Sequence, residues 1–537
     1  MNMSHQPIPR WAHGGVLLLG ALGFGLLALS LGQDSNWDLR NYHWYNPYAF
    51  LAGRHQFDIA VAQGPTYYNP LPDLPAFLLA QQLSARATAF AIGALQAFNL
   101  FLLYLVGCRT LAVQAAWPRA ALALGTALLG TTGSIFVSEV GTTLQDTLLS
   151  LPLLLGLLLI LHRDAVLRAG PGWIATALLA GFLAGLSMGL KTTSAVWALG
   201  LCLAFLAVPG LGALARLHRA FLFGIGALAG AAVSGGWWFF HVWKLFGNPV
   251  FPYFNNLFRS PLVLPDSYKD EKFLPNGFWD GLTYPLASVL DPLRVSEVPF
   301  LDLRIPLLLL VSLVSLILIA GRRWGPAGRA PLWSAPQAAF VAAFALIGYV
   351  IWLLLFAVYR YAVVLEMLAP LALLGFFAGW PIARRAAIGL SVVALAALAL
   401  ISSPADWGRV PFGERFVEVN WPSLMREADP ERTLLLMTGI EPMGYVVPSL
   451  PPQIPVLRIQ SYLFNPFNGA GFTKVAHRRL AEHEGRILTL ALAVDGDVER
   501  MLAAYGLARD PSECQPVTSP LGPELALCPV HPAVGGE

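Results

Sequence analysis

Charged residues are scarce in this chain: Asp, Glu, Lys and Arg make up 12% of its 537 residues, whereas hydrophobic residues make up 56%. With a mean hydropathy of +0.61, the composition excludes an ordinary soluble globular protein. Apolar runs of about 18 or more residues recur along the chain, and each is long enough to cross a bilayer as a helix. The sequence therefore predicts a polytopic α-helical membrane protein.

Cysteines and known catalytic motifs are equally few. The four cysteines form no CxxC motif and the chain has no HExxH motif, so a zinc enzyme has no support. Neither the composition nor the net charge of +3 suggests a nucleic-acid partner. Cys514 and Cys528 flank a turn rich in Pro and Gly in the polar tail, where we expect a disulfide if the tail lies in an oxidising compartment.

The apolar runs define about eleven predicted spans. They cover residues 13–31, 88–107, 119–137, 143–161, 172–189, 193–209, 220–240, 303–321, 335–357, 363–381 and 386–402. No small-residue cleavage pattern follows the first run, so we interpret it as an uncleaved span rather than a signal peptide.

Arginines lie in every second connection between these spans. They are Arg109, Arg119, Arg163, Arg168, Arg216, Arg219, Arg322, Arg323, Arg329, Arg384 and Arg385. The positive-inside rule assigns these short connections, and with them the N-terminus, to the cytoplasm. Loops 32–87 and 241–302 and the tail from residue 403 are then expected on the opposite side of the membrane.

The chain is expected to divide into a transmembrane domain, residues 1–402, and an extracytoplasmic domain, residues 403–537. In the tail, residues 431–439 and 486–494 have the pattern of buried strands, and residues 498–505 have that of a helix. About 120 residues suffice for an independent core. We therefore predict a small C-terminal α/β domain outside the membrane.

The first external loop carries a candidate catalytic base. If residues 38–46 form a helix that Pro47 ends or kinks, Asp38, Tyr42 and Tyr45 lie on one face of that helix, because they are spaced by three to four residues. A carboxylate held between aromatic side chains beside a membrane is a candidate general base.

Two further acids of this loop are candidate substrate-binding residues. Asp34 lies about one turn before Asp38 and either shares its role, replaces it or does neither. Asp73 belongs to the Pro-rich segment 69–75, which we expect to be an extended return to the membrane. Contact with substrate and simple solvation are both open for Asp73.

Other charges lie at the external ends of later spans. Glu139 and Asp146 lie between the third and fourth spans, where acids are either functional or merely solvated at the water boundary. Lys191 is the only charge between the fifth and sixth spans, and Arg360 follows the ninth. Each of these cations suits an anionic phosphate, although snorkelling to the interface explains it as well.

Taken in order, these residues resemble the pattern of bacterial GT-C glycosyltransferases. The resemblance covers residues 1 to about 400 and is carried by Asp38 with Tyr42 and Tyr45, segment 48–53, the Pro-rich return 69–75, Asp146, and segments 190–192 and 359–361. It implies a GT-C-like fold in which the tail is an accessory domain. It also implies a multi-pass protein of the bacterial inner membrane, with the tail in the periplasm or outside the cell.

The resemblance implies transfer of a sugar, with inversion, from a polyprenyl-phosphate-linked donor to a lipid, polysaccharide or protein acceptor. Asp38 would be the general base that deprotonates the acceptor. Lys191 and Arg360 would hold the leaving phosphate, and Asp146 or Glu139 would orient the acceptor.

Two departures from the family pattern concern metal and acceptor. Residues 39–40 are Leu-Arg where many relatives carry a second acid, and residues 69–70 are Asn-Pro where many carry Lys-Pro-Pro. The metal ligands are therefore unassigned. A divalent cation, Mg²⁺ or Mn²⁺, held by Asp146 or Glu139 is left open as a cofactor.

Two other classes of function compete with a glycosyltransferase. A transporter or flippase of lipid-linked or small polar substrates usually has charges or broken helices near the middle of the membrane, and often internal repeats. The sequence shows neither feature, because its notable acids gather at one face. A catalytically idle assembly protein that binds partners through its tail is the third possibility.

Overall fold

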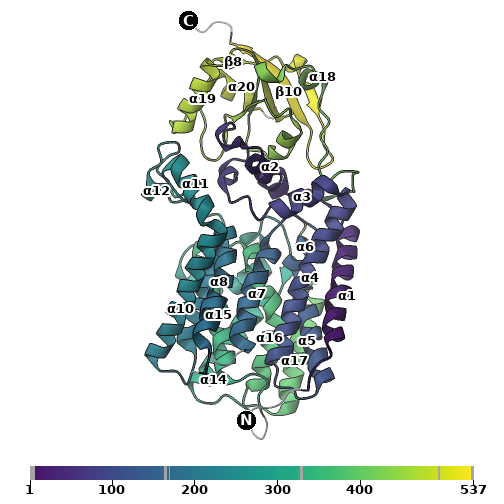
Figure 1. The fold of residues 1–537 in the computed structure, drawn as a ribbon, viewed down its shortest axis with the longest axis vertical. Coiled ribbons are helices and arrows are strands. Elements are labelled where there is room, and N and C mark those ends of the chain that lie inside the picture. The colour runs from purple at the N-terminus through teal and green to yellow at the C-terminus, as the bar shows by residue number, and fades with distance from the viewer. Residues whose placement is uncertain (1–5, 163–165, 169, 327–329, 494–495, 534–537) are drawn as a thin grey trace.

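The computed structural model describes residues 6–533 except 163–165, 169, 327–329 and 494–495. Arg163 and Arg329, two of the arginines named above, lie outside the described residues. Figure 1 shows a long helical bundle with a β-sheet at one end. The first helix, α1 (Arg10–Leu31), begins at the end of the bundle far from the sheet and leads towards it.

Each predicted apolar run overlaps at least one helix, although the run at 119–137 is interrupted at residues 131–133. The other bundle helices are α4 (Ala85–Thr110), α5 (Ala116–Gly130), α7 (Asp146–His162), α8 (Trp173–Leu190), α9 (Ala195–Ala204), α10 (Ala213–Ala231), α11 (Trp237–Phe246), α14 (Arg304–Ala320), α15 (Ala335–Leu355), α16 (Val363–Gly379) and α17 (Arg384–Leu400). Among the described residues, six helical stretches are long and apolar enough to cross a membrane, and they are 10–31, 85–110, 173–190, 213–246, 335–355 and 359–379. Three shorter apolar helices cover 146–162, 192–207 and 304–320.

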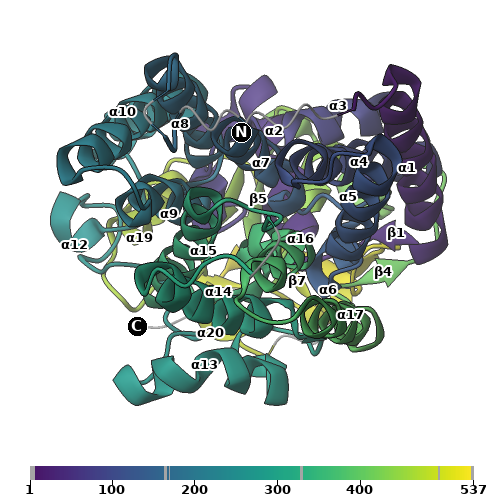
Figure 2. The same ribbon diagram turned by 90° about the horizontal axis from the view of Figure 1, so that it is seen from below.

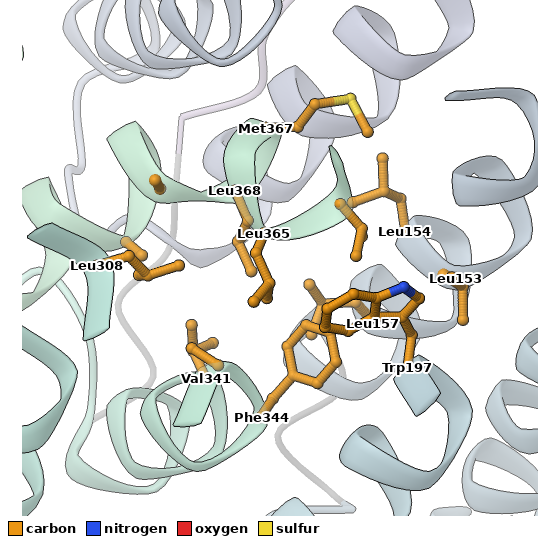
Figure 3. Close-up of a cluster of buried hydrophobic side chains, with 14 of the residues drawn as sticks. Leu153, Leu154, Leu157, Trp197, Leu308, Val341, Phe344, Leu365, Met367 and Leu368 are labelled. Atoms are coloured by element: carbon orange, nitrogen blue, oxygen red, sulfur yellow. The ribbon is translucent and has the colours of Figure 1, made fainter. Parts of the chain in front are cut away.

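The centre of the bundle is filled by interlocking apolar side chains. In Figure 3, Leu157 of α7, Trp197 of α9, Phe344 of α15 and Leu365 of α16 point towards one another. The rings of Trp197 and Phe344 meet edge to face with centroids 6.4 Å apart. Because lipid tails are as apolar as these side chains, close packing rather than escape from water stabilises this core.

A stripe of glycines lets α8 and α10 approach closely. A Cβ on Gly181, Gly185 or Gly189 would lie 2.0–2.5 Å from a backbone carbonyl oxygen of the segment that begins with α10. Residues 185–189 also match the G-x-S-x-G pattern of a nucleophile elbow. Ser187, however, is buried within α8, where its hydroxyl donates to the Leu149 carbonyl at 2.7 Å, so it is a packing residue.

The first external loop is folded into short helices. It contains β1 (Gln33–Asp34), the π-helix η1 (Leu39–His43), α2 (Tyr45–Leu51) and α3 (Leu74–Gln82). The predicted helix over 38–46 is present as two helical segments, because residues 39–43 form a π-helix and α2 begins after Trp44. Pro47 lies in the first turn of α2, where its missing N–H needs no partner, and so it neither ends nor kinks the helix.

The second external loop carries a helix with an exposed apolar face. In α13 (Phe278–Leu290), the exposed side chains Phe278, Leu282, Leu286 and Leu290 recur at the spacing of one helix face. Figure 2 shows α13 at the periphery, beyond α14. Such a face is typical of a helix that lies in a membrane interface.

The tail forms a mixed sheet in the order β6-β5-β7-β10-β8, with β9 beside β10. Its strands are β5 (Thr433–Met437), β6 (Val456–Arg458), β7 (Arg486–Leu492), β8 (Leu507–Ala508), β9 (Gln515–Val517) and β10 (Leu525–Pro532). The strands predicted at 431–439 and 486–494 correspond to β5 and β7, and the predicted helix at 498–505 to α20 (Val498–Ala503). Cys514 and Cys528 are joined by a disulfide.

The sheet is fastened to the first external loop. Ile59 pairs with Leu457 as an added parallel bridge beside β6, and Asp58 Oδ1 accepts a hydrogen bond from the Val456 N–H at 2.9 Å. The Arg458 guanidinium, fully buried at this junction, donates to the Val61 carbonyl at 3.0 Å. Burial lowers the pKa of Arg458 to about 9. The sheet therefore covers the loop that contains Asp38.

Candidate active site

Four charged side chains form one chain of ion pairs at the end of the bundle that carries the sheet. Arg360 Nη1 donates to Asp38 Oδ2 at 2.8 Å, and Arg360 Nε lies 3.4 Å from Asp146 Oδ2. Lys191 Nζ donates to Asp146 Oδ1 at 2.7 Å. The structure thus brings together two acids and two cations that the sequence placed at the ends of separate helices.

Helix ends position each of these charges. Asp146 is the first residue of α7 and Lys191 follows the last residue of α8, so each sits where the helix dipole favours its charge. Asp38 directly precedes η1, and Arg360 lies in the 3-10 turn η8 (Tyr359–Ala362) ahead of α16. Regular helices on both sides therefore fix the backbone that holds the cluster.

The cluster is largely shielded from water without being sealed. The side chains of Asp38 and Arg360 are 15% and 12% exposed. Burial disfavours a charge on Asp38, but the positive charges of Arg360, His43 and Lys191 outweigh it and lower the pKa of Asp38 below its usual value. Asp38 is therefore a carboxylate at neutral pH, held by its counter-ion.

Aromatic rings surround the two cations. Lys191 Nζ lies 5.0 Å from the ring centroid of Tyr361, and the Arg360 guanidinium lies 5.6 Å from the same ring and 5.8 Å from that of Trp407. Such cation–π contacts hold a charge in place while leaving its hydrogen-bond donors available.

Tyr42 lies beside the acids as the sequence predicts, among other rings. Its ring centroid is 4.1 Å from that of His43 and 5.4 Å from that of Tyr68. Burial, reinforced by the negative charge of Asp38, raises the pKa of Tyr42 well above its ordinary value. Tyr42 is therefore a neutral wall of the site rather than a base.

Tyr45 lies elsewhere, so its predicted place beside Asp38 is wrong. Its hydroxyl donates to Asp58 Oδ2 at 2.9 Å, and Arg54 Nε donates to the same oxygen at 2.6 Å. The spacing argument fails because η1 is a π-helix, whose wider turn changes which residues stack, and because a new helix begins at Tyr45. Tyr45 instead supports the junction with the sheet.

Asp34 does not share the place of Asp38. It is fully buried, and its Oδ2 accepts hydrogen bonds from both the backbone N–H and the hydroxyl of Thr143 at 2.7 Å. Its Oδ1 accepts from the Asn36 side chain at 2.6 Å. Asp34 therefore fastens the loop that leads to Asp146, and the prediction that it binds substrate is not supported by its position.

Glu139 lies behind Asp146 rather than beside the opening. It is fully buried, and its Oε2 accepts from the Thr147 N–H at 2.9 Å. Burial, reinforced by the negative charge of Asp146, raises the pKa of Glu139 well above its ordinary value. The enclosed Glu139 orients the start of α7, and in this position its side chain is not exposed to an acceptor.

Asp73 forms a second polar cluster with residues that the sequence analysis missed. His43 Nδ1 lies 2.5 Å from Asp73 Oδ1, and the Gln145 amide donates to the same oxygen. Asp73 is buried, so simple solvation does not describe it. His43 is five residues after Asp38 and Gln145 is next to Asp146, which are the only sequence signals that could have singled them out.

The side chains present do not fit a bound metal. In the part of the chain that the structure describes, no group of three or more His, Cys, Asp or Glu side chains is arranged to hold an ion. Asp38 and Asp146 face cations, and Glu139 is enclosed. No step below is therefore routed through a metal.

No protein-family model and no curated protein matches this chain. Solved structures of similar fold include ArnT from Cupriavidus metallidurans bound to undecaprenyl phosphate, with TM-score 0.45, 12% identity, and coverage of 97% of this chain and 98% of that one. For the same protein in the apo state, the TM-score is 0.44 and the identity 13%, with 96% of this chain and 97% of that one covered. For the Archaeoglobus fulgidus oligosaccharyltransferase in the apo form, the TM-score is 0.41 and the identity 11%, with 92% of this chain and 71% of that one covered. At this degree of likeness, function has to be inferred from the chain's own charges and contacts.

Proposed function

We propose that this chain transfers a sugar from a polyprenyl-phosphate-linked donor to a lipid, polysaccharide or protein acceptor outside the cytoplasm. The observation that carries the proposal is the chain of ion pairs from Asp38 through Arg360 and Asp146 to Lys191. It lies at one end of an apolar bundle, partly exposed, where a lipid-borne phosphate and a water-borne acceptor can meet.

The two cations have donors to spare for a phosphate. A guanidinium has five N–H donors, yet among the described residues Arg360 makes one hydrogen bond, to Asp38. Lys191 similarly has three donors and makes one hydrogen bond, to Asp146. Because both cations lie against Asp146, they can face the same anion, and charge-assisted bonds from Arg and Lys are the usual means of holding phosphate.

Donor binding would activate Asp38. A phosphate that draws Arg360 and Lys191 towards itself competes with Asp38 for the same charges. Since those charges are what lower the pKa of Asp38, their neutralisation raises that pKa and makes the carboxylate a stronger base. The base therefore becomes effective when the donor is in place.

The transfer itself needs one proton acceptor and one anion site. The acceptor hydroxyl gives its proton to Asp38 as its oxygen forms a bond to the anomeric carbon. The bond from that carbon to the phosphate oxygen breaks on the opposite side, which inverts the configuration. Arg360 and Lys191 stabilise the leaving polyprenyl phosphate, and general-base help of this kind contributes roughly 10²–10⁴-fold.

The distribution of charge supports an orientation. Arg109, Arg216 and Arg384 lie near helix ends far from the sheet, whereas the four site residues lie at ends near it. With positive residues inside, the site and the sheet face the outside of a bacterial inner membrane and the N-terminus faces the cytoplasm. The division at residue 402 into a catalytic and an accessory domain belongs to the same proposal.

The test is Asp38→Asn in the purified protein, reconstituted with undecaprenyl-phosphate-linked pentoses and hexoses that carry a radiolabelled sugar. Asn keeps the shape of the side chain but cannot take a proton, so we expect transfer to fall at least about 100-fold. Asp280→Asn is the matched control. It weakens another partly exposed ion pair, with Arg294 at 2.7 Å, which includes none of the four site residues.

Retained turnover in Asp38→Asn would remove Asp38 from the role of base. If instead label crosses the membrane still attached to its prenyl phosphate, with no covalent transfer by the wild type, the protein is a flippase and the glycosyltransferase proposal is wrong.

A further inference from the structure

The segment that follows the last bundle helix, α17, connects the two external loops beside the ion-paired cluster. Short strand pairings fix both of its ends. On one side β3 (Ser402–Ser403) pairs with β2 (Leu301–Asp302) of the second external loop, and on the other β4 (Arg409–Val410) pairs with β1 of the first. Residues 404–408 between these pairings are called the strap below.

The backbone of the strap is fixed where it approaches the first external loop. The Gly408 carbonyl accepts a hydrogen bond from the Ser35 N–H at 3.2 Å, and the Gly408 N–H donates to Asp406 Oδ1 at 2.9 Å. Gly408 has a φ of 114°, which residues with a side chain rarely adopt. The strap therefore presents Trp407, the residue between them, from a defined position.

Trp407 contacts the arginine proposed to bind phosphate. Its ring centroid lies 5.8 Å from the Arg360 guanidinium, and the ring is half-buried. Its indole Nε1 donates to Glu297 Oε2 at 3.4 Å, and Glu297 is an exposed residue of the second external loop. An aromatic ring and an exposed carboxylate are thus held together next to Arg360.

The chemistry of the proposed donor places a sugar at this point. In a polyprenyl-phosphate sugar the anomeric carbon is bonded to a phosphate oxygen, so the sugar ring begins one bond away from the group that Arg360 would hold. Transfer also requires that carbon to meet an acceptor hydroxyl at Asp38, whose Oδ2 is 2.8 Å from Arg360 Nη1. The sugar ring must therefore lie against the side chains that surround Arg360.

Trp407 and Glu297 have the chemistry that binds a sugar. The C–H groups of a sugar ring carry a slight positive charge and the face of an aromatic ring is negative, so the two attract each other when they stack. A carboxylate accepts hydrogen bonds from the sugar hydroxyls, and such charge-assisted bonds are stronger than neutral ones. Apolar walls with a few placed polar groups are typical of sites for small ligands.

We propose that Trp407 and Glu297 form the subsite for the sugar ring of the donor, with the indole stacked on the ring and the carboxylate accepting from its hydroxyls. This inference rests on the proposed function. It assigns the choice of sugar to the strap and the second external loop, whereas Arg360 and Lys191 recognise the phosphate that all such donors share.

The test compares a lipid that carries the sugar with one that does not. The Kd values of undecaprenyl phosphate and of the undecaprenyl-phosphate-linked sugar that the wild type consumes are measured on the purified protein in nanodiscs, without acceptor. Glu297→Gln keeps the shape of the side chain but loses its charge. The Kd of the sugar-bearing lipid should therefore rise about tenfold, while that of undecaprenyl phosphate changes less than about twofold. Glu271→Gln, the same substitution at another exposed acid of this loop, should leave both Kd values unchanged.

Two variants of Trp407 isolate the contribution of the ring. Trp407→Leu and Trp407→Phe both lose the hydrogen bond to Glu297, but only Trp407→Phe keeps an aromatic face. Trp407→Leu should therefore bind the sugar-bearing lipid about threefold to tenfold more weakly than Trp407→Phe, with a smaller difference for undecaprenyl phosphate. In Glu297→Gln, the kcat/KM values for radiolabelled pentose and hexose donors should also become more alike, which a merely structural role of Glu297 would not produce.

The outcomes separate the two proposals. If the wild type transfers sugar but Glu297→Gln binds both lipids as the wild type does, or weakens both by the same factor, the subsite is wrong and the enzyme stands. Equal binding of the sugar-bearing lipid by Trp407→Leu and Trp407→Phe would likewise contradict the stacking role of the ring. If the wild type transfers no sugar from any of these donors, the proposed function fails and the subsite fails with it.

Discussion

Two ion-paired clusters lie at the same end of the bundle and differ in how completely the protein satisfies them. Arg304 and Asp302 are fully buried, and the Arg304 guanidinium donates to Asp302, to the Leu129 carbonyl at 2.9 Å, and to the Thr132 and Ser402 hydroxyls. Arg360, by contrast, is 12% exposed and makes one hydrogen bond to the protein.

The comparison shows that arginine has two different roles in this protein. Arg304 bonds to segments near residues 130, 302 and 402, so its guanidinium serves to hold the fold together. Arg360 is held near Asp38 with most of its donors uncommitted. A cation whose donors exceed its partners, at the edge of an apolar bundle, is suited to an anion that arrives with a lipid.

The largest effect is expected on stability, when the buried Arg304–Asp302 pair is broken. Arg304→Met leaves the Asp302 charge buried without its partner, which should cost about 3–5 kcal/mol of stability. Thermal unfolding in detergent or nanodiscs measures it. Arg360→Met, the matched variant, should unfold close to the wild-type temperature and lose transfer. Equal stability of the two variants would remove the distinction drawn between the clusters.

A milder change tests the shape of the Arg360 head group. Arg360→Lys keeps the charge but loses the planar fork that can bind two phosphate oxygens at once, so kcat/KM should fall about tenfold to a hundredfold, or about 1.4–2.8 kcal/mol. Steady-state kinetics with the donor consumed by the wild type provide the measurement. A fully active Arg360→Lys would mean that only the charge matters.

Lys191 should contribute to donor binding more than to the chemical step. Lys191→Met is expected to raise the donor KM about tenfold, equivalent to about 1.4 kcal/mol, with a smaller change in kcat. Because the variant also leaves Asp146 without its hydrogen bond, Lys191→Met combined with Asp146→Asn is the control. An unchanged KM in both variants would exclude a phosphate contact.

The smallest effect is expected on donor binding, when the Tyr361 ring that contacts Lys191 and Arg360 is removed. Tyr361→Leu removes a cation–π contact worth about 0.5–1 kcal/mol, so the donor KM should rise about twofold to fivefold. Tyr361→Phe keeps the ring and should behave as the wild type. If the two substitutions weaken binding equally, the hydroxyl and not the ring is responsible.

Much of this fold could be predicted from the sequence, because apolar runs locate helices and rare charges mark their ends. The fold class, a polytopic helical membrane protein with a C-terminal α/β region, is confirmed. Asp146 and Lys191 could be placed because each adjoins a long, unambiguous helix. The site charges gather at one end of the bundle because successive helices run in opposite directions, which brings every second connection to the same end.

The details of the external loop could not be predicted in the same way. A π-turn depends on backbone hydrogen bonding that no residue type predicts, so the spacing of Asp38 and Tyr45 was misleading, although Tyr42 lies as expected. Tyr45 donates to Asp58, and Asp58 in turn accepts from a strand of the sheet some 400 residues later in the chain. Such pairings, and that of His43 with Asp73 across 30 residues, emerge only when the chain is folded.

The central claim is that the donor phosphate takes Arg360 away from Asp38, and the most direct test is the affinity of the purified protein for undecaprenyl phosphate. Asp38→Asn removes the negative charge that competes with the phosphate for Arg360, so this inactive variant should bind the lipid phosphate about tenfold more tightly than the wild type. Equal or weaker binding by Asp38→Asn would contradict the account, because Asp38 and phosphate would then not share the same cation.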